Sequence, residues 1–353
     1  MGSFDNIFKA VEKAVEKDPM LSVHKAGDIT ISSYIPFGIP SGIPELDFNF
    51  GRPGWPAGRC VELYGFEHCG KTTLAYHAVA QAQRMGGGGY FIDTEKSWDE
   101  NRAAQCGVNP DIKFGIGDAD SIEGVFRMVD AICDARLDDN DGTPFVIVID
   151  SITGTATEFM KTHDQGKEER LGQDARAIRG GMRRITEKIA RAKINLFMIN
   201  HAISTIPKHK FAKQSEAAGG HAIKLFSTIR INLANLGWIH VGADENKRRI
   251  GQNITLKIEK LKNSSMQYTE VKEIQLLNTI GFDTESNLLD AGIKAGWIEH
   301  SKGSKSYSLG GNSFPRSDWP VLVSEMGGLD EAYKTFVGWC MEAGLMKPWG
   351  AVG

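Results

Sequence analysis

Residues 61–73 read Val-Glu-Leu-Tyr-Gly-Phe-Glu-His-Cys-Gly-Lys-Thr-Thr. An apolar run ends at Gly65, four residues follow, and Gly70-Lys71-Thr72 completes the P-loop pattern. The two glycines let the backbone turn so that its N–H groups point at phosphate oxygens. Lys71 would reach the β- and γ-phosphates, and the Thr72 hydroxyl would bind Mg²⁺. The stretch therefore predicts a nucleoside-triphosphate site between a strand and a helix whose positive end faces the phosphates.

The composition sets limits on the rest of the chain. A length of 353 residues suits two domains, or one large core with appendages. The net charge of −3 means that any nucleic-acid site must be a local basic patch. No apolar run is long enough to span a membrane, so we expect no membrane partner. Five cysteines without CxxC spacing and no visible signal peptide lead us to expect a cytoplasmic protein.

Three further apolar runs predict buried strands: Tyr90–Asp93, Phe145–Asp150 and Leu196–His201. A helical pattern at residues 121–136 lies between the first two. Strands that alternate with helices favour an α/β fold with a mostly parallel sheet, in which ligands bind at the carboxyl ends of the strands. We expect antiparallel strands at residues 229–280 to close one end of this sheet.

Two other segments carry expectations of their own. Residues 86–89 are four glycines, which predict a flexible break after the P-loop helix. From Gly281 onward, short helices and turns predict a small separate domain.

Polar side chains stand at the ends of the predicted strands. Asp150 occupies the place of an acid that holds the Mg²⁺ shell, and Glu95 could orient and deprotonate an attacking water. His201 could sense a γ-phosphate by hydrogen bonding. Each residue also has a structural interpretation: a capping acid, a surface acid and a histidine at a sheet edge. The P-loop upstream favours the functional interpretation of Asp150, and the sequence alone favours it for Glu95.

Residues 161–213 form a basic stretch, with 13 lysines and arginines against 5 acids. One helical face is apolar and consists of Leu171, Ala175, Ile178, Met182, Ile185 and Ile189. Arg176, Arg179 and Arg183 form a stripe roughly opposite, which matches phosphates along a nucleic-acid strand or is simply a solvated face. Gly180-Gly181 falls within the pattern and predicts a hinge or the close approach of another backbone.

Residues 202–220 have no core periodicity, and we expect a functional loop there. Lys208, Lys210 and Lys213 surround Phe211, a mixture of charge and base stacking that is used on single strands. Because the loop begins beside His201, a γ-phosphate sensed at its base could order the loop and couple ATP to DNA binding.

Two segments offer contacts to a neighbouring subunit. Lys260 and Lys262 have strand spacing and point the same way, either to guard an exposed strand edge or to reach a γ-phosphate bound by the adjacent protomer. Residues 3–17 carry an apolar stripe with helical spacing and precede an irregular segment rich in proline and glycine. This helix could fold onto its own core or dock on a neighbour.

In this order, the motifs resemble those of the RecA-type homologous-recombination ATPases. The resemblance covers about residues 1–310. Seven segments carry it. They are the Walker A segment with its acid Glu67 (residues 65–73), the strand ending in Glu95 (91–95), the Walker B strand (146–151), the sensor strand (197–201), the Gly-Gly signature (219–224), the lysine pair (260–262) and a C-terminal pattern (287–298).

The resemblance implies a RecA-like P-loop ATPase core and a filament on single-stranded DNA. ATP and Mg²⁺ would be clamped between protomers, and the filament would pair with homologous duplex DNA and exchange strands in recombination and repair. The implied domains are an N-terminal polymerisation helix and linker at 1–34, the core at 35–280, and a small C-terminal α/β domain at 281–353. The N-terminal helix would then dock on the next protomer.

The resemblance also implies roles for residues. Glu95 would activate water, while His201, Lys260 and Lys262 would act on the γ-phosphate. Asp99 and Arg102 would lie near the adenine, with Arg102 standing where bacterial members carry a stacking tyrosine. The remaining nucleotide contacts would come from Gly65, Phe66, Glu67, His68, Cys69, Gly70, Lys71, Thr72 and Thr73. The DNA contacts would come from Leu171, Arg176, Arg179, Arg183, Lys208, Lys210, Phe211, Lys213, Gly219, Gly220 and His221.

Some positions depart from the family pattern. His201 replaces the usual glutamine, so the switch would work differently or respond to pH. Ala202-Ile203 stands where an arginine is expected, the family's acidic tail is missing, and residues 311–353 match poorly. This divergence would suit a phage-encoded or distant member.

Two other functions share parts of this pattern. A hexameric replicative helicase has the same core, but the lysine pair and the Gly219-Gly220 loop fit a recombinase better. A non-catalytic mediator could bind ATP and a partner recombinase as a structural module, but the retained Glu95 argues against it.

Overall fold

The computed structural model describes residues 3–15, 34–139, 141–162, 167–204, 215–218, 221–242, 246–262, 269–301 and 303–350. The chain divides into two units, Met1–Tyr34 and Ile35–Gly353. In the first unit, the predicted N-terminal helix is present as α1 (Ser3–Val15), and its Ile7 and Val11 are exposed. No helix in the described part of the chain is long and apolar enough to cross a membrane.

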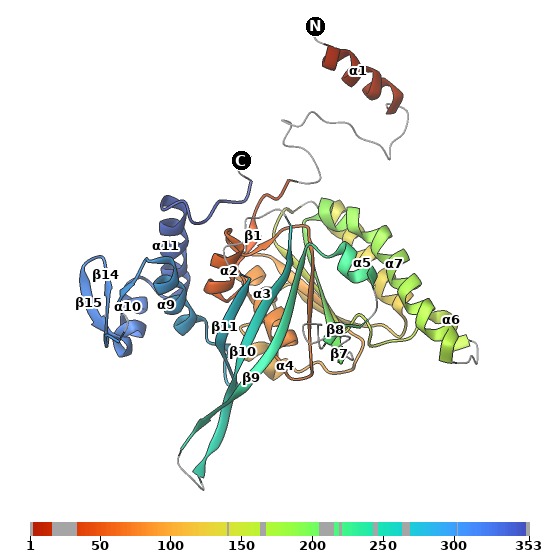
Figure 1. Cartoon of the computed structure of the whole chain (residues 1–353). Helices are drawn as coiled ribbons and strands as arrows, with labels where there is room; N and C mark the ends of the chain where they lie inside the picture. The colour runs from red at the N-terminus through yellow and green to blue at the C-terminus, as the bar shows by residue number, and fades with distance from the viewer. Residues whose placement is uncertain are drawn as a thin grey trace, which may run out of the picture. The chain divides into compact units, whose positions relative to one another are not determined.

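The second unit is built on a ten-stranded sheet (Figure 1). Its parallel strands run in the order β3-β7-β6-β4-β5 and are β3 (Cys60–Gly65), β4 (Gly88–Asp93), β5 (Phe114–Asp118), β6 (Phe145–Asp150) and β7 (Ile194–Ser204). The helices that alternate with them are α3 (Lys71–Arg84), α4 (Glu100–Gln105), α5 (Ile122–Asp139), α6 (Glu158–Thr162) and α7 (Lys167–Ala192). Helical crossovers return each strand parallel to its neighbour. The predicted α/β fold with a mostly parallel sheet is confirmed.

Antiparallel strands extend the sheet beyond β3, as predicted. Strand β9 (Ile229–Val241) pairs parallel with β3 and antiparallel with β10 (Arg248–Leu261). β11 (Glu270–Leu277) and β12 (Gly281–Phe282) complete this edge. In Figure 1 the long β9 and β10 continue together beyond the other strands as a two-stranded ribbon.

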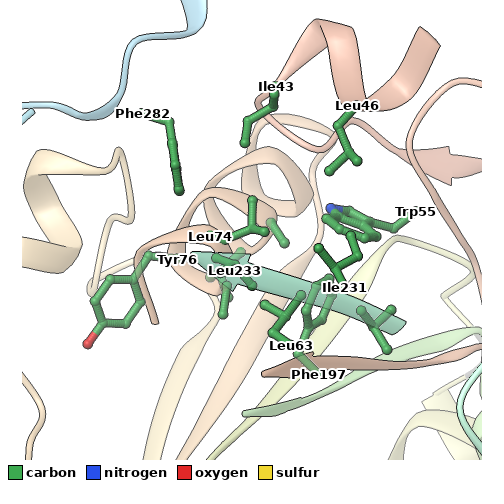
Figure 2. Close-up of a cluster of buried hydrophobic side chains, with 14 of the residues drawn as sticks. Ile43, Leu46, Trp55, Leu63, Leu74, Tyr76, Phe197, Ile231, Leu233 and Phe282 are labelled. Carbon is green, nitrogen blue, oxygen red and sulfur yellow. The ribbon is translucent and has the colours of Figure 1, made fainter. Parts of the chain in front are cut away.

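The apolar runs bury both faces of the sheet because successive side chains point to opposite sides. Along β6, Val146 and Val148 join a cluster that includes residues of α2 (Pro44–Phe50) and α3, part of which Figure 2 shows. Ile147 and Ile149 join a second cluster with residues of α5, α7 and α8 (His221–Phe226). A separate two-stranded sheet joins β1 (Gly38–Ile39) to β2 (Trp55–Pro56).

The structure differs from the predictions at two glycine-rich segments, residues 180–181 and 86–89. Helix α7 runs unbroken through Gly180-Gly181, and its predicted apolar face is buried at Ile178, Met182, Ile185 and Ile189. A Cβ at Gly181 would lie 2.2 Å from the ring of Phe126 on α5, so a side chain of α5, not another backbone, needs this glycine. The predicted flexible break at residues 86–89 is wrong: Gly88 and Gly89 begin β4, and a Cβ at Gly87 would lie 1.8 Å from the Pro144 carbonyl oxygen.

The C-terminal segment has its own hydrophobic cluster, which includes Trp297, Trp319 and Phe336 and which Phe48 of α2 joins. Its elements are α9 (Thr284–Ala295), β13 (Glu299–His300), β14 (Ser306–Leu309), β15 (Asn312–Pro315), the 3₁₀ turn η2 (Arg316–Asp318), α10 (Trp319–Glu325) and α11 (Leu329–Glu342).

A buried hydrogen bond ties this segment to the core. Asp47 of α2 accepts a hydrogen bond of 2.6 Å from the Tyr333 hydroxyl of α11, and its carboxylate also accepts from the Ser41 N–H. Burial raises the pKa of Asp47 to about 7, and the hydrogen bond from Tyr333 opposes this rise. The carboxylate is therefore mostly ionised above pH 7, where it depends most on its donors.

We expect Tyr333→Phe to reduce the free energy of unfolding by about 1.5 kcal/mol at pH 8, the cost of leaving a buried acceptor without one donor. The loss should be smaller at pH 5, where Asp47 is protonated and the bond contributes less. Urea denaturation at both pH values measures the difference. Lys334→Ala, a change at the exposed next residue of α11, serves as the control. An equal loss at both pH values for Tyr333→Phe would contradict the prediction.

Candidate nucleotide and DNA sites

The register of the parallel strands places their carboxyl ends at one edge of the sheet. Gly65 of β3 pairs with His201 of β7, and Asp93 of β4 pairs with Asp150 of β6. A pocket of about 350 Å³ lies at this edge, and its lining includes Lys71, Thr72, Glu95, Asp150 and His201. The structure thus brings together residues from four segments that the sequence analysis had singled out separately.

The P-loop turns sharply between β3 and α3. His68 and Gly70 have positive φ angles of 57° and 89°, and α3 begins directly afterwards at Lys71. Phe66, Glu67 and His68 are exposed, whereas Cys69 is buried and donates to the Phe66 carbonyl oxygen. The buried Lys71 ammonium donates to the carbonyl oxygens of Gly65 and Phe66, at 3.1 and 2.7 Å. A cation and a helix N-terminus therefore meet inside one loop, which is a favourable place for an anion.

The two residues predicted to hold the metal are in contact. The Thr72 hydroxyl donates to the Asp150 carboxylate at 2.6 Å. Burial raises the pKa of Asp150 to about 6, and the bond from Thr72 opposes this rise. A hydroxyl and a carboxylate beside a phosphate-binding loop are the oxygen ligands that suit Mg²⁺.

Glu95 is held by two donors. Its Oε1 accepts from the Ser151 hydroxyl and lies 2.8 Å from His201 Nε2. Burial acts to raise the pKa of Glu95, but these two hydrogen bonds, together with the charges of His201 and Lys71, hold the pKa below its ordinary value. The carboxylate is therefore ionised at neutral pH and fixed in orientation.

The turn that presents Glu95 depends on Asp93, which the sequence analysis left without a role. The buried Asp93 carboxylate accepts from the backbone N–H groups of Glu95, Ser97 and Trp98 at 3.2, 3.1 and 2.9 Å. An aspartate that bonds N–H groups after it in a turn is a recognisable signal, so Asp93 could have been found. The contact from Ser151 arises between two strand ends and had no local signal.

A second pocket of about 790 Å³ shares the P-loop with the first and extends to other elements. Asp99 caps α4 by accepting from the Arg102 N–H, and Arg102 Nη1 donates to the carbonyl oxygens of Leu277 and Asn278 at 3.1 and 2.9 Å. The lining also includes residues that the sequence analysis missed: Trp238, Arg249, Gln252 and Asn278.

The two lysines lie apart from these pockets. Lys260, in β10, donates to the carbonyl oxygens of Lys224 and Leu225 at the end of α8. Burial and, to a smaller extent, the nearby charge of Lys262 lower its pKa to about 8. Lys262 follows the end of β10 and is exposed. Neither lysine is among the residues that line the two pockets described above.

The arginine stripe on α7 faces outward. Arg176, Arg179 and Arg183 are exposed, on the opposite side from the buried apolar face. The adjacent Arg184 is different, because it pairs with the buried Asp130 of α5.

The segment expected to be a loop after His201 is partly a strand. Strand β7 continues to Ser204 and pairs antiparallel with β8 (Ser215–Ala217), so the expected end of the strand at His201 is wrong. The pairing is supported by a hydrogen bond of 2.9 Å from the Ala218 N–H to the His201 carbonyl oxygen. Several predicted DNA contacts lie outside the described residues: Lys208, Lys210, Phe211, Lys213, Gly219 and Gly220. The side chains of Leu171 and His221 are also outside the described part of the structure.

A buried polar network crosses the sheet beneath the site. Arg230 of β9 pairs with Glu62 of β3 and, at 3.0 Å, with Glu259 of β10. Asn200 of β7 donates to Glu62 at 3.0 Å and to the Ala218 carbonyl oxygen at 2.9 Å. The network therefore joins the strand of His201 to the strand of Lys260.

Comparison with known proteins agrees with this geometry. Residues 3–283 match the family described as the RecA N-terminal domain. The chain is 32% identical to Protein RecA of Arthrobacter sp. (strain FB24) over 263 residues, which cover 74% of this chain and 71% of that protein. It is 28% identical to Protein RecA of Enterococcus faecium over 305 residues, covering 86% and 82%. For Protein RecA of Francisella tularensis subsp. novicida (strain U112), the identity is 30% over 269 residues, covering 76% and 71%.

RecA-family proteins are DNA-dependent ATPases that bind single-stranded DNA as oligomeric filaments and act in recombination and DNA repair. With this match over most of its length, and with a P-loop, a strand-end aspartate and a strand-end glutamate at one sheet edge, this chain belongs to the RecA family of recombinases.

Proposed function

We propose that this chain pairs a single DNA strand with homologous duplex DNA and exchanges the strands, using ATP bound at the P-loop edge of the sheet. The observation that carries the proposal is the convergence of Lys71, the Thr72–Asp150 pair and Glu95 in one pocket. A phosphate anchor, a set of metal ligands and a carboxylate that could activate water are the parts that phosphoryl transfer to water needs.

The phosphates would be held by the loop N–H groups, the N-terminus of α3 and Lys71. Lys71 now bonds to two carbonyl oxygens of its own loop, and a phosphate would replace these as the partner of the ammonium. Thr72 and Asp150 would hold Mg²⁺, which when bound neutralises charge on the phosphate oxygens. Because the pKa of Asp150 is about 6, the carboxylate is mostly ionised at neutral pH.

Glu95 would orient and deprotonate the attacking water. Its hydrogen bonds from Ser151 and His201 lower its basicity, because they stabilise the ionised form. If His201 turns to a γ-phosphate, Glu95 loses one donor and becomes a stronger base. We therefore assign His201 two roles, as the sensor of the phosphate and as the residue that restrains Glu95.

The DNA would lie along α7 and the segment after β7. The exposed Arg176, Arg179 and Arg183 support phosphate contacts on α7. Asn200 donates to the Ala218 carbonyl oxygen, so the strand that carries His201 is joined to the far end of the segment that contains Phe211. This contact supports a link between the nucleotide and the predicted second DNA loop.

A neighbouring protomer would complete the site. Lys262 is exposed and does not line either of the two pockets beside the P-loop of its own subunit. This supports a contact to the γ-phosphate bound by the adjacent subunit. The exposed Ile7 and Val11 of α1 support docking of that helix on a neighbour. The helicase and mediator alternatives are not favoured by the family match.

The proposal predicts that ATP turnover rises strongly when single-stranded DNA is added, and that the protein forms joint molecules between this strand and homologous duplex. A coupled ATPase assay and a joint-molecule gel measure the two activities, with Glu95→Gln as a variant that should bind ATP and DNA without turnover. Equal turnover with and without DNA, or unwinding of a forked duplex without joint molecules, would contradict the proposal.

Lys262→Ala should leave ATP binding by the DNA-free subunit within about twofold of wild type, but reduce DNA-stimulated turnover by about 100-fold or more, the scale seen for charges supplied by a neighbour. Lys257→Ala is the matched control, because Lys257 is also an exposed lysine of β10. Binding by calorimetry and turnover at saturating DNA separate the two effects. A loss of ATP affinity in the isolated subunit would place Lys262 in its own subunit's site.

Arg176→Ala should weaken binding to single-stranded DNA of any sequence and lower the slope of log affinity against log salt by about 0.7, the value for one phosphate contact. Arg184→Ala is the matched control. It removes the same charge from α7, but the Arg184 side chain pairs with Asp130 of α5, so the slope should stay unchanged. Fluorescence anisotropy over a series of salt concentrations gives both slopes. Identical slopes for wild type and Arg176→Ala would exclude Arg176 from the DNA interface.

A further inference from the structure

The larger pocket beside the P-loop is lined in part by residues of the β9–β10 hairpin, to which the proposed function assigns no role. Trp238 of β9 and Arg249 of β10 line it together with Asp99 and Arg102 at the start of α4. The following inference rests on the proposed function, because it takes the triphosphate to lie on the P-loop. It concerns the group attached to that triphosphate, the nucleotide base.

The hairpin is fixed to the phosphate-binding loop. Trp238 and Gln252 are direct partners in the β9–β10 ladder, so their side chains share one face of the hairpin. The Gln252 amide donates to the His68 carbonyl oxygen at 2.6 Å, and its own oxygen accepts from Asn235 at 2.5 Å. Because Gln252 is buried and bonded on both sides, the ladder sets the position of Trp238 relative to the P-loop.

The indole ring of Trp238 is both supported and accessible. The guanidinium carbon of Arg249 lies 4.0 Å from the centre of the ring, which is a cation–π contact. Trp238 nevertheless remains 46% exposed, an unusual state for so large an apolar side chain beside a polar pocket. A flat aromatic surface next to a phosphate site is suited to stacking on a base.

Arg102 is engaged elsewhere. Its Nη1 donates to the carbonyl oxygens of Leu277 and Asn278 at 3.1 and 2.9 Å. Asn278 in turn donates to the Arg249 carbonyl oxygen at 3.3 Å. Arg102 therefore braces the turn after β11, and this turn contacts the strand that carries Arg249.

We propose that Trp238, supported by Arg249, is the surface on which the base of the bound nucleotide stacks. The stacking surface is thus supplied by the β9–β10 hairpin and not by α4. A purine offers a larger stacking surface than a pyrimidine, so Trp238 sets a preference for purine nucleotides.

The test measures binding of two ligands, MgATP and magnesium tripolyphosphate, to the full chain without DNA. Trp238→Ala should weaken ATP binding by roughly tenfold, as expected when one base–aromatic stack is lost. It should leave the affinity for tripolyphosphate unchanged, because that ligand has no base. Trp238→Phe should restore most of the ATP affinity. Leu236→Ala, at another exposed apolar residue of the hairpin, should behave as wild type for both ligands.

The outcomes separate this inference from the proposed function. If wild type binds both ligands and Trp238→Ala binds ATP as tightly as wild type, only the stacking role is overturned. Equal weakening for ATP and tripolyphosphate overturns it too, since the variant would then have disturbed the P-loop. Failure of wild type to bind either ligand, with Lys71→Ala indistinguishable from it, overturns the proposed function and the stacking role together.

Discussion

The backbone register of the parallel strands is the constraint on which the candidate nucleotide site depends. Because Gly65 pairs with His201 and Asp93 with Asp150, groups that are far apart in the sequence finish at one edge of the sheet. Apolar runs that are buried on both faces hold this register, since a slip of one residue would exchange the two faces of a strand. The same slip in β4 would separate Glu95 from Ser151. Packing in the core therefore positions the polar groups at the edge.

The network beneath the site adds a second constraint. Arg230 lies between two carboxylates, Glu62 and Glu259, and all three side chains are almost inaccessible to solvent. Removal of one partner would leave an uncompensated buried charge, which costs far more than the intact cluster contributes. Such a cluster favours one arrangement of β7, β3, β9 and β10. The residue after Asn200 is His201, and the residue after Glu259 is Lys260, so the cluster adjoins both residues along β7 and β10.

Local patterns predicted the parts of the structure that local chemistry decides. The P-loop, the strand end at Asp150 and the buried face of α7 each lie within one continuous segment, whose spacing is visible in the sequence. Residues 86–89 show where this fails, because Gly87 and Gly88 are required by the approach of the Pro144 and Lys113 backbones, which lie far away in the sequence. Ala202–Ser204 lack a core period because their partner is the short β8, not the core. Ser151 acquires its position beside Glu95 from the pairing of β4 with β6, and Trp238 acquires its position from the contact of its hairpin with the P-loop.

If His201 is the proposed sensor of the γ-phosphate, it must work differently from the glutamine that the family resemblance leads one to expect at this position. A glutamine side chain carries two N–H donors, whereas a neutral imidazole carries one. In this structure Nε2 is the ring nitrogen directed at Glu95, so the proton that it donates there is not available to a phosphate. Sensing the γ-phosphate with Nε2 and restraining Glu95 are then mutually exclusive for the neutral ring. A nucleotide that attracts Nε2 would at the same time release the carboxylate, and recognition of the triphosphate would become the event that activates the base.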